Sequence, residues 1–94
     1  MDKGEFFKSI FEEITDFPQV VVMNLPHLVV VGNLEIDLEN FDSLLEYTSE
    51  KIRVGTGMGI VMFSGSNLEI KMISQNEIII MGRIKSIELG LSGR

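Results

Sequence analysis

Apolar and polar residues alternate along much of the chain, and the alternation predicts strands. The stretch LEIDLENFDSLLEYTSEKIRV, from Leu34 to Val54, begins with the acids Glu35, Asp37 and Glu39 at every second position. Side chains two residues apart share one face of a strand, so the acids lie on one face and the apolar residues between them on the other. The apolar set is Leu34, Ile36 and Leu38. We therefore predict a hairpin with an acidic outer face.

The same kind of pattern continues through the rest of the chain. From Gln19 onward, short apolar and β-branched segments follow one another about every eight to ten residues, with turn-forming residues between them. The segments are QVVVMN, HLVVVGN, LEIDLEN, LLEYTS, KIRVGT, GIVMFSG, NLEIKMI and EIIIMGRIKSIEL. No helix-sized segment separates them, which argues against parallel βαβ units. We predict an antiparallel meander of seven or eight strands over residues 18–94, forming a small sandwich or roll, with a β-solenoid as the alternative.

Several of these segments, such as VVVM and IIIM, are apolar on both faces and need cover on both sides. A second sheet, an N-terminal helix or a partner subunit could supply that cover. The residues expected to lie inside are Ile36, Leu38, Ile70, Ile80 and Ile84.

The first 17 residues follow a helical pattern instead. Apolar residues recur there at spacings of three and four, at Phe6, Phe7, Ile10, Phe11 and Ile14. Pro18 ends the predicted helix, because a proline disfavours the α conformation in the residue before it. The apolar stripe packs either on the core of its own domain or on a partner. Acids outnumber bases in the segment, which argues against attachment to an anionic membrane.

Composition limits the classes of function. A length of 94 residues suits one domain, residues 1–94, and a net charge of −6 argues against binding to nucleic acid. The absence of cysteine excludes disulfides and thiolate chemistry, and fits a reducing compartment. No apolar run is long enough to insert in a membrane, and the N-terminus does not resemble a signal peptide. We expect a cytoplasmic protein.

No catalytic, cofactor or metal site is predicted. The glycines of GTGMG, residues 55–59, lack the lysine of a phosphate-binding loop, and fit a hairpin loop or a bare strand face. His27 is the single histidine, too few for a typical transition-metal site. Glu35, Asp37 and Glu39 stand about 7 Å apart along a strand, whereas a calcium loop folds its ligands around the ion. We interpret the three acids as a solvated face.

The order and spacing of short motifs across residues 18–89 resemble the YabP/YqfC family of sporulation proteins from endospore-forming Firmicutes, and most nearly its YqfC branch. The matching features are Leu25 and Pro26, Gly32 and Asn33, Glu39 and Asn40, LLEY at Leu44 to Tyr47, Ile52 and Arg53, Gly65, and GRI at Gly82 to Ile84. Two departures are His27, where an arginine is expected, and FDS at Phe41 to Ser43, which replaces a turn of His, a basic residue and Gly.

The resemblance implies a non-enzymatic protein of spore formation that acts in the mother cell. It also implies a membrane-bound partner of the YqfD type, through which the protein would associate with a membrane. We predict a small interaction module, with a self-assembling structural subunit, and hence a homo-oligomer, as the alternative. The candidate partner-binding residues are Phe7, Phe11, Glu35, Asp37 and Glu39, the phenylalanines as anchors and the acids as the orienting charges.

Overall fold

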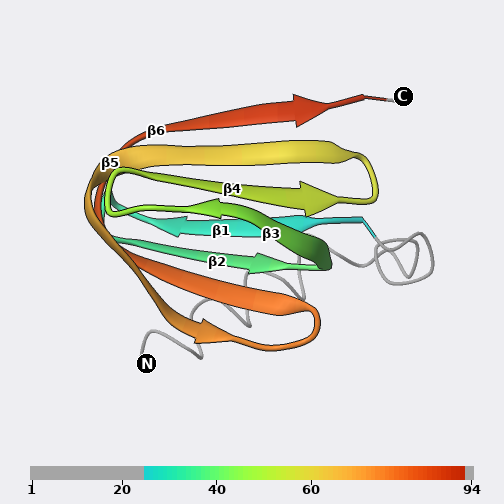
Figure 1. Cartoon of the computed structure of the whole chain (residues 1–94), viewed down its shortest axis with the longest axis horizontal. Coiled ribbons are helices and arrows are strands. Elements are labelled where there is room, and N and C mark those ends of the chain that lie inside the picture. Colours follow the sequence, from blue (N-terminus) through green and yellow to red (C-terminus); the bar gives the residue numbers. More distant parts are fainter. Residues whose placement is uncertain (1–24, 93–94) are drawn as a thin grey trace.

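The computed structural model describes residues 25–92, and within that range the chain forms six strands and no helix. All six join one antiparallel sheet in the order β1-β2-β6-β5-β4-β3 (Figure 1). The strands are β1 (His27–Val31), β2 (Glu35–Glu39), β3 (Phe41–Tyr47), β4 (Lys51–Thr56), β5 (Gly59–Ile73) and β6 (Glu77–Leu91).

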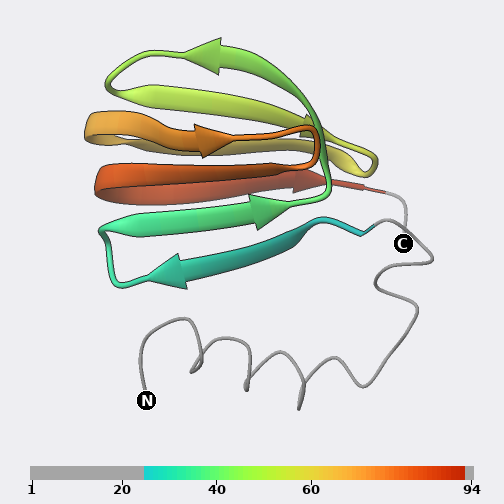
Figure 2. The same ribbon diagram turned by 90° about the horizontal axis from the view of Figure 1, so that it is seen from below.

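Strands β5 and β6 are 15 residues long, whereas the others have five to seven. Both long strands bend sharply, so that the sheet folds over and its two halves face each other (Figures 1 and 2). The β2 half contains β1, β2, residues 77–81 of β6 and residues 69–73 of β5. The β4 half contains β3, β4, residues 59–64 of β5 and residues 86–91 of β6.

Residues without a bulky side chain allow the bend. Gly82 has a φ of +145°, and a Cβ added there would lie 2.5 Å from the carbonyl oxygen of Asn67. At Gly65, an added Cβ would collide with the carbonyl group of Arg83. Asn67 itself has a φ of 53°, and the pairing of β5 with β6 shifts register within this stretch. Such irregularities bend a strand and increase its twist.

Two hairpin turns are tied to the bend by main-chain hydrogen bonds. At the β1–β2 turn, the carbonyl of Leu34 accepts a bond from the amide of Gly82 at 3.1 Å. Next to the β3–β4 turn, the carbonyl of Glu50 accepts a bond from the amide of Gly65 at 3.0 Å. Each half of the sheet is therefore anchored to the strand that bends beside it.

The core lies between the two halves. The buried residues come from β2, β4, β5 and β6 and from the start of β3: Ile36, Leu38, Phe41, Ile52, Val54, Val61, Phe63, Leu68, Ile78, Ile80 and Ile84. The prediction that Ile36, Leu38, Ile80 and Ile84 lie inside is confirmed. Ile70 is partly buried and packs against this cluster.

The number of strands differs from the prediction. GIVMFSG and NLEIKMI form one continuous strand, β5, because Gly65 and Asn67 bend the chain there without ending its pairing. The predicted strand QVVVMN and the predicted helix over residues 1–17 lie outside the described residues. The β-solenoid alternative is wrong, because every pairing between described strands is antiparallel.

The path of the chain after β2 also differs from a simple meander. Strand β2 pairs with β1 and β6, whereas β3 pairs with β4, so only the second part of the stretch Leu34–Val54 is a hairpin. Asn40 makes the crossing between the two halves with a φ of 65°. Leu34 is 60% exposed, contrary to the prediction, because it lies in the turn before β2.

Replacing Ile80 by Asp should prevent folding. Ile80 has no exposed surface, and a buried carboxylate without a partner costs several kcal/mol, about as much as the whole stability of a small domain. Met81, the next residue, is 38% exposed, so Met81→Ser is the matched control and should fold. Circular dichroism and thermal melting would measure both, and a cooperative melt of Ile80→Asp near that of the parent would contradict the core assignment.

Gly82→Ala should destabilise the folded protein by about 2 kcal/mol or more, because a side chain there is strained and meets the Asn67 carbonyl. Gly57 lies in the β4–β5 turn with nothing within 4 Å of an added Cβ, so Gly57→Ala is the control and should change stability little. Chemical denaturation would compare the two. Equal stability of both variants would show that the bend does not depend on Gly82.

Candidate partner-binding face

The outer face of the β2 half carries the three acids of the predicted strip. Ile36 and Leu38 point into the core, so Glu35, Asp37 and Glu39 point outward from β2. The structure thus places the three acids on one surface, which we call the acidic face. The other two predicted binding residues, Phe7 and Phe11, lie outside the described residues.

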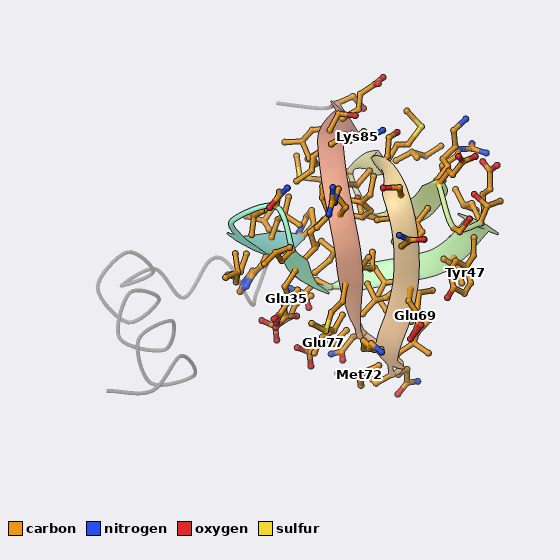
Figure 3. The ribbon with its side chains drawn as sticks, turned by 90° about the vertical axis from the view of Figure 1, so that its left-hand side faces the viewer. Glu35, Tyr47, Glu69, Met72, Glu77 and Lys85 are labelled. Carbon is orange, nitrogen blue, oxygen red and sulfur yellow. The ribbon has the colours of Figure 1, made fainter. Side chains whose placement is uncertain are left out.

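Strand pairing extends the acidic face onto two further strands. Glu77 of β6 lies opposite Glu39, and Glu69 of β5 lies opposite Met81, which in turn pairs with Glu35. Figure 3 shows Glu35, Glu77 and Glu69 at the same side of the folded sheet. Five carboxylates therefore share the face: Glu35, Asp37, Glu39, Glu69 and Glu77.

Apolar side chains lie between these acids. Val29, Asp37, Ile79 and Met72 form one row across four strands, and Met81 lies in the next row. Met81 is 38% exposed, and the others are partly exposed. An apolar strip between acidic rows can bury area against a partner while the charges fix its orientation.

Few positive charges of the described residues balance the acidic face. The Nδ1 atom of His27 lies 3.5 Å from Oε1 of Glu39, and the Lys71 ammonium group lies 2.7 Å from Oε1 of Glu69. Both pairs are at the margins of the face, on the edge strand β1 and near the end of β5. The Lys71–Glu69 pair is exposed and contributes little stability, and the His27–Glu39 contact is an ion pair only if His27 is protonated.

Asp37 is the acid on this face whose pKa is raised by its surroundings. Partial burial of the Asp37 carboxyl, a hydrogen bond shared with Glu77 and the charge of Glu77 together raise the pKa of Asp37 to about 7. The charges of Glu39 and Glu35 act in the same direction. The Asp37 carboxyl therefore keeps its proton up to about pH 7. The ionised form of Asp37 is therefore unfavourable on this face, and a positive charge placed beside it would stabilise that form.

Sequence reasoning missed Glu77 and Glu69 as members of this face. Both come from strands far along the chain, and their proximity depends on the pairing of β2 with β6, which no local pattern reveals. The only signal was the alternation of NLEIKMI and the position of Glu77 at a strand start. Within residues 25–92, no group of three or more His, Cys, Asp or Glu side chains is arranged to hold a metal ion.

The described part of the chain contains no helix of the length and apolarity that crossing a membrane requires.

The fold and the acidic face define the class of protein: a small all-β protein built on one folded antiparallel sheet. A sequence profile of the YabP family matches residues 24–93. The chain is also 36% identical over 77 residues to "Uncharacterized protein YqfC" of Bacillus subtilis (strain 168), a match that covers 82% of this chain and 83% of that protein. The chain therefore belongs to the YabP family, which confirms the resemblance seen in its sequence. Membership of the YabP/YqfC family suggests a sporulation-related protein.

Asp37→Asn should stabilise the protein most above pH 7. The Asp37 pKa is 3.8 in its ordinary state and about 7 in the fold, so the folded protein keeps a proton that the unfolded chain releases between these values. The stability of the parent therefore falls as pH rises from about 4 to about 7. The variant should not lose stability through this titration, so at neutral pH it should be more stable than the parent by about 1–2 kcal/mol. This gain is smaller than the full pKa shift of Asp37 implies, because the carboxyl group is partly exposed.

Thermal melting from pH 4 to pH 8 would measure this difference. Asp42→Asn is the matched control, because Asp42 is exposed on β3 and lies away from the acidic face. Identical pH profiles for the parent and Asp37→Asn would show that the carboxyl pair does not form.

Proposed function

We propose that this protein is a non-enzymatic interaction module of sporulation that acts in the mother cell by binding a membrane-bound partner of the YqfD type. The sporulation role rests on family membership. The observation that supports binding is the acidic face, where five carboxylates converge from β2, β5 and β6 around an apolar strip.

The chemistry of the acidic face indicates the kind of segment that it would bind. A partner segment with Lys or Arg side chains would neutralise the acids and relieve the repulsion between Asp37 and Glu77. Apolar side chains of the same segment would cover Val29, Ile79 and Met72, which lie in one row. The anchor predicted from the sequence, the apolar stripe with Phe7 and Phe11, would add contacts that depend little on salt.

Open-ended self-assembly, the alternative predicted from the sequence, has less support. Of the segments that looked apolar on both faces, IIIM of β6 buries one face in the core, and VVVM lies outside the described residues. At one of the two edges of the sheet, β3 pairs with β4 through two register shifts, and such irregularities make that edge a poor template for another strand.

Changing Glu35, Asp37 and Glu39 together to Ser should slow association with the partner at least about tenfold at low salt, because attraction between opposite charges raises association rates by roughly 10- to 1,000-fold. Salt should weaken the parent complex and have less effect on the variant. Surface plasmon resonance with an immobilised, detergent-solubilised YqfD-type protein would measure the rates.

The matched control changes three other acids, Asp42, Glu46 and Glu50, to Ser. It alters net charge equally but lies on β3 and its turn, away from the acidic face. Equal slowing in both triple variants would mean that only net charge matters. If neither triple variant changes binding, the acidic face is not the partner-binding surface. If binding is lost only with Phe7→Ala and Phe11→Ala, the apolar stripe of these residues makes the whole contact.

A further inference from the structure

The outer face of the β4 half differs from the acidic face in its charge. Ile52 and Val54 point inward from β4, so Lys51 and Arg53 point outward. The acids on this face are Glu46 of β3 and Glu88 of β6. Arg53 forms an ion pair with Glu46 of the same copy, with Nη1 3.5 Å from Oε1. Two bases therefore balance two acids, and a second copy of the chain could approach this face without the repulsion that the acidic face would impose.

This balanced face also has a flat apolar centre. Ile60 is 39% exposed and points outward from β5, between Gly55 of β4 and Gly90 of β6. Leu45, 47% exposed, lies beside Gly55, where an added Cβ would be 3.7 Å from its Cδ1 atom. The side chains of Ser43 and Leu45 cover Gly55, so the exposed Ile60 and Leu45 side chains supply the apolar contact area at this centre.

The charged residues follow one row across the strands. Arg53 of β4 pairs with Met62 of β5, and Met62 pairs with Glu88 of β6. Arg53 and Glu88 thus lie on opposite sides of Met62, each about 4.8 Å away in the direction across the sheet.

We propose that two copies of this chain pack through the outer faces of their β4 halves, around a two-fold axis that runs along β5 and passes Met62. Rotation about this axis exchanges the two sides of the row, so Arg53 of each copy faces Glu88 of the other. Ile60 and Met62 then meet their own counterparts at the centre, and Gly55 of one copy faces Gly90 of the other. The face is self-complementary in both charge and shape.

A two-fold axis between β4 and β5 would be unfavourable. It would place Glu46 of one copy opposite Glu88 of the other, and Met62 opposite Arg53. Like charges opposite each other oppose association, so the charge pattern selects the axis at Met62. Packing of two sheet faces with nearly aligned strands is also the usual geometry of β-sandwiches.

The size of the face sets the expected strength. Four strands spaced about 4.8 Å apart, with about five residues each at about 3.4 Å, give a footprint of roughly 300 Å² per copy. Standard interfaces bury about 800 Å² per partner, so we expect a weak dimer with a dissociation constant in the micromolar range or above. The dimer would leave both acidic faces on its outside, and two linked acidic faces would bind a clustered partner more tightly than one.

Two opposite charge reversals test the proposal. In Arg53→Glu, two glutamates face each other twice across the axis, and in Glu88→Arg two arginines do so. Each variant alone should be a monomer at concentrations where the parent dimerises, with a dissociation constant at least about tenfold higher. A mixture of the two variants should form a heterodimer. In it the introduced glutamate of one variant faces the introduced arginine of the other, and the unchanged Glu88 and Arg53 face each other as in the parent.

Sedimentation velocity of the parent, each variant and the mixture would measure association, and thermal melting would verify folding. Glu69→Arg is the control, because Glu69 is exposed on the acidic face, outside the proposed interface, and this change should leave dimerisation within about threefold of the parent. A monomeric parent at high micromolar concentration, a dimer indifferent to both reversals, or growth beyond the dimer would each overturn the proposal. These outcomes are independent of binding to the acidic face, so the two proposals can fail separately.

Discussion

The continuity of β5 and β6 through the bend is the constraint on which the rest of the structure depends. Each long strand belongs to both halves of the sheet, so folding the strands also brings the two inner faces together. Gly65 and Gly82 allow the carbonyl groups of the neighbouring strand to approach, and two hairpin turns are hydrogen-bonded to the bend. On one flank the hydroxyl of Tyr47 accepts a bond from the amide of Ile70 at 3.1 Å, which ties the two halves together. Within the described residues, the core is therefore formed by the strands of this one sheet.

Folding the sheet leaves two outer faces, and their chemistry differs. The β2 half collects five carboxylates around an apolar strip, whereas the β4 half has balanced charges around Ile60 and Met62. This asymmetry suits a module with two separate contacts, one for a basic partner and one for a second copy. The raised pKa of Asp37 means that its ionised carboxylate is unfavourable in the fold, where burial and the neighbouring acids act against the charge.

Local patterns predicted the strands but not how they are connected in space. The alternation around Ile36 and Leu38 predicted the inward face of β2 correctly, because one side of a strand must bury its apolar residues. GIVMFSG and NLEIKMI looked like two strands, yet around Asn67 the register shifts and one strand continues, since pairing with β6 holds the chain on both sides. The pairing of β2 with β6 joins residues about forty positions apart, and no period in the sequence encodes it. For that reason Glu77 could not be assigned to the site in advance.

The central functional claim is that the acidic face binds the partner, and carboxyl footprinting tests it most directly. Carbodiimide labelling followed by mass spectrometry would compare the free protein with the complex formed with a YqfD-type protein. We predict that Glu35, Glu39 and Glu77 lose reactivity in the complex, while Asp42 and Glu46 on β3 keep it. Protection of the β3 acids, with Glu35, Glu39 and Glu77 as reactive as in the free protein, would contradict the account.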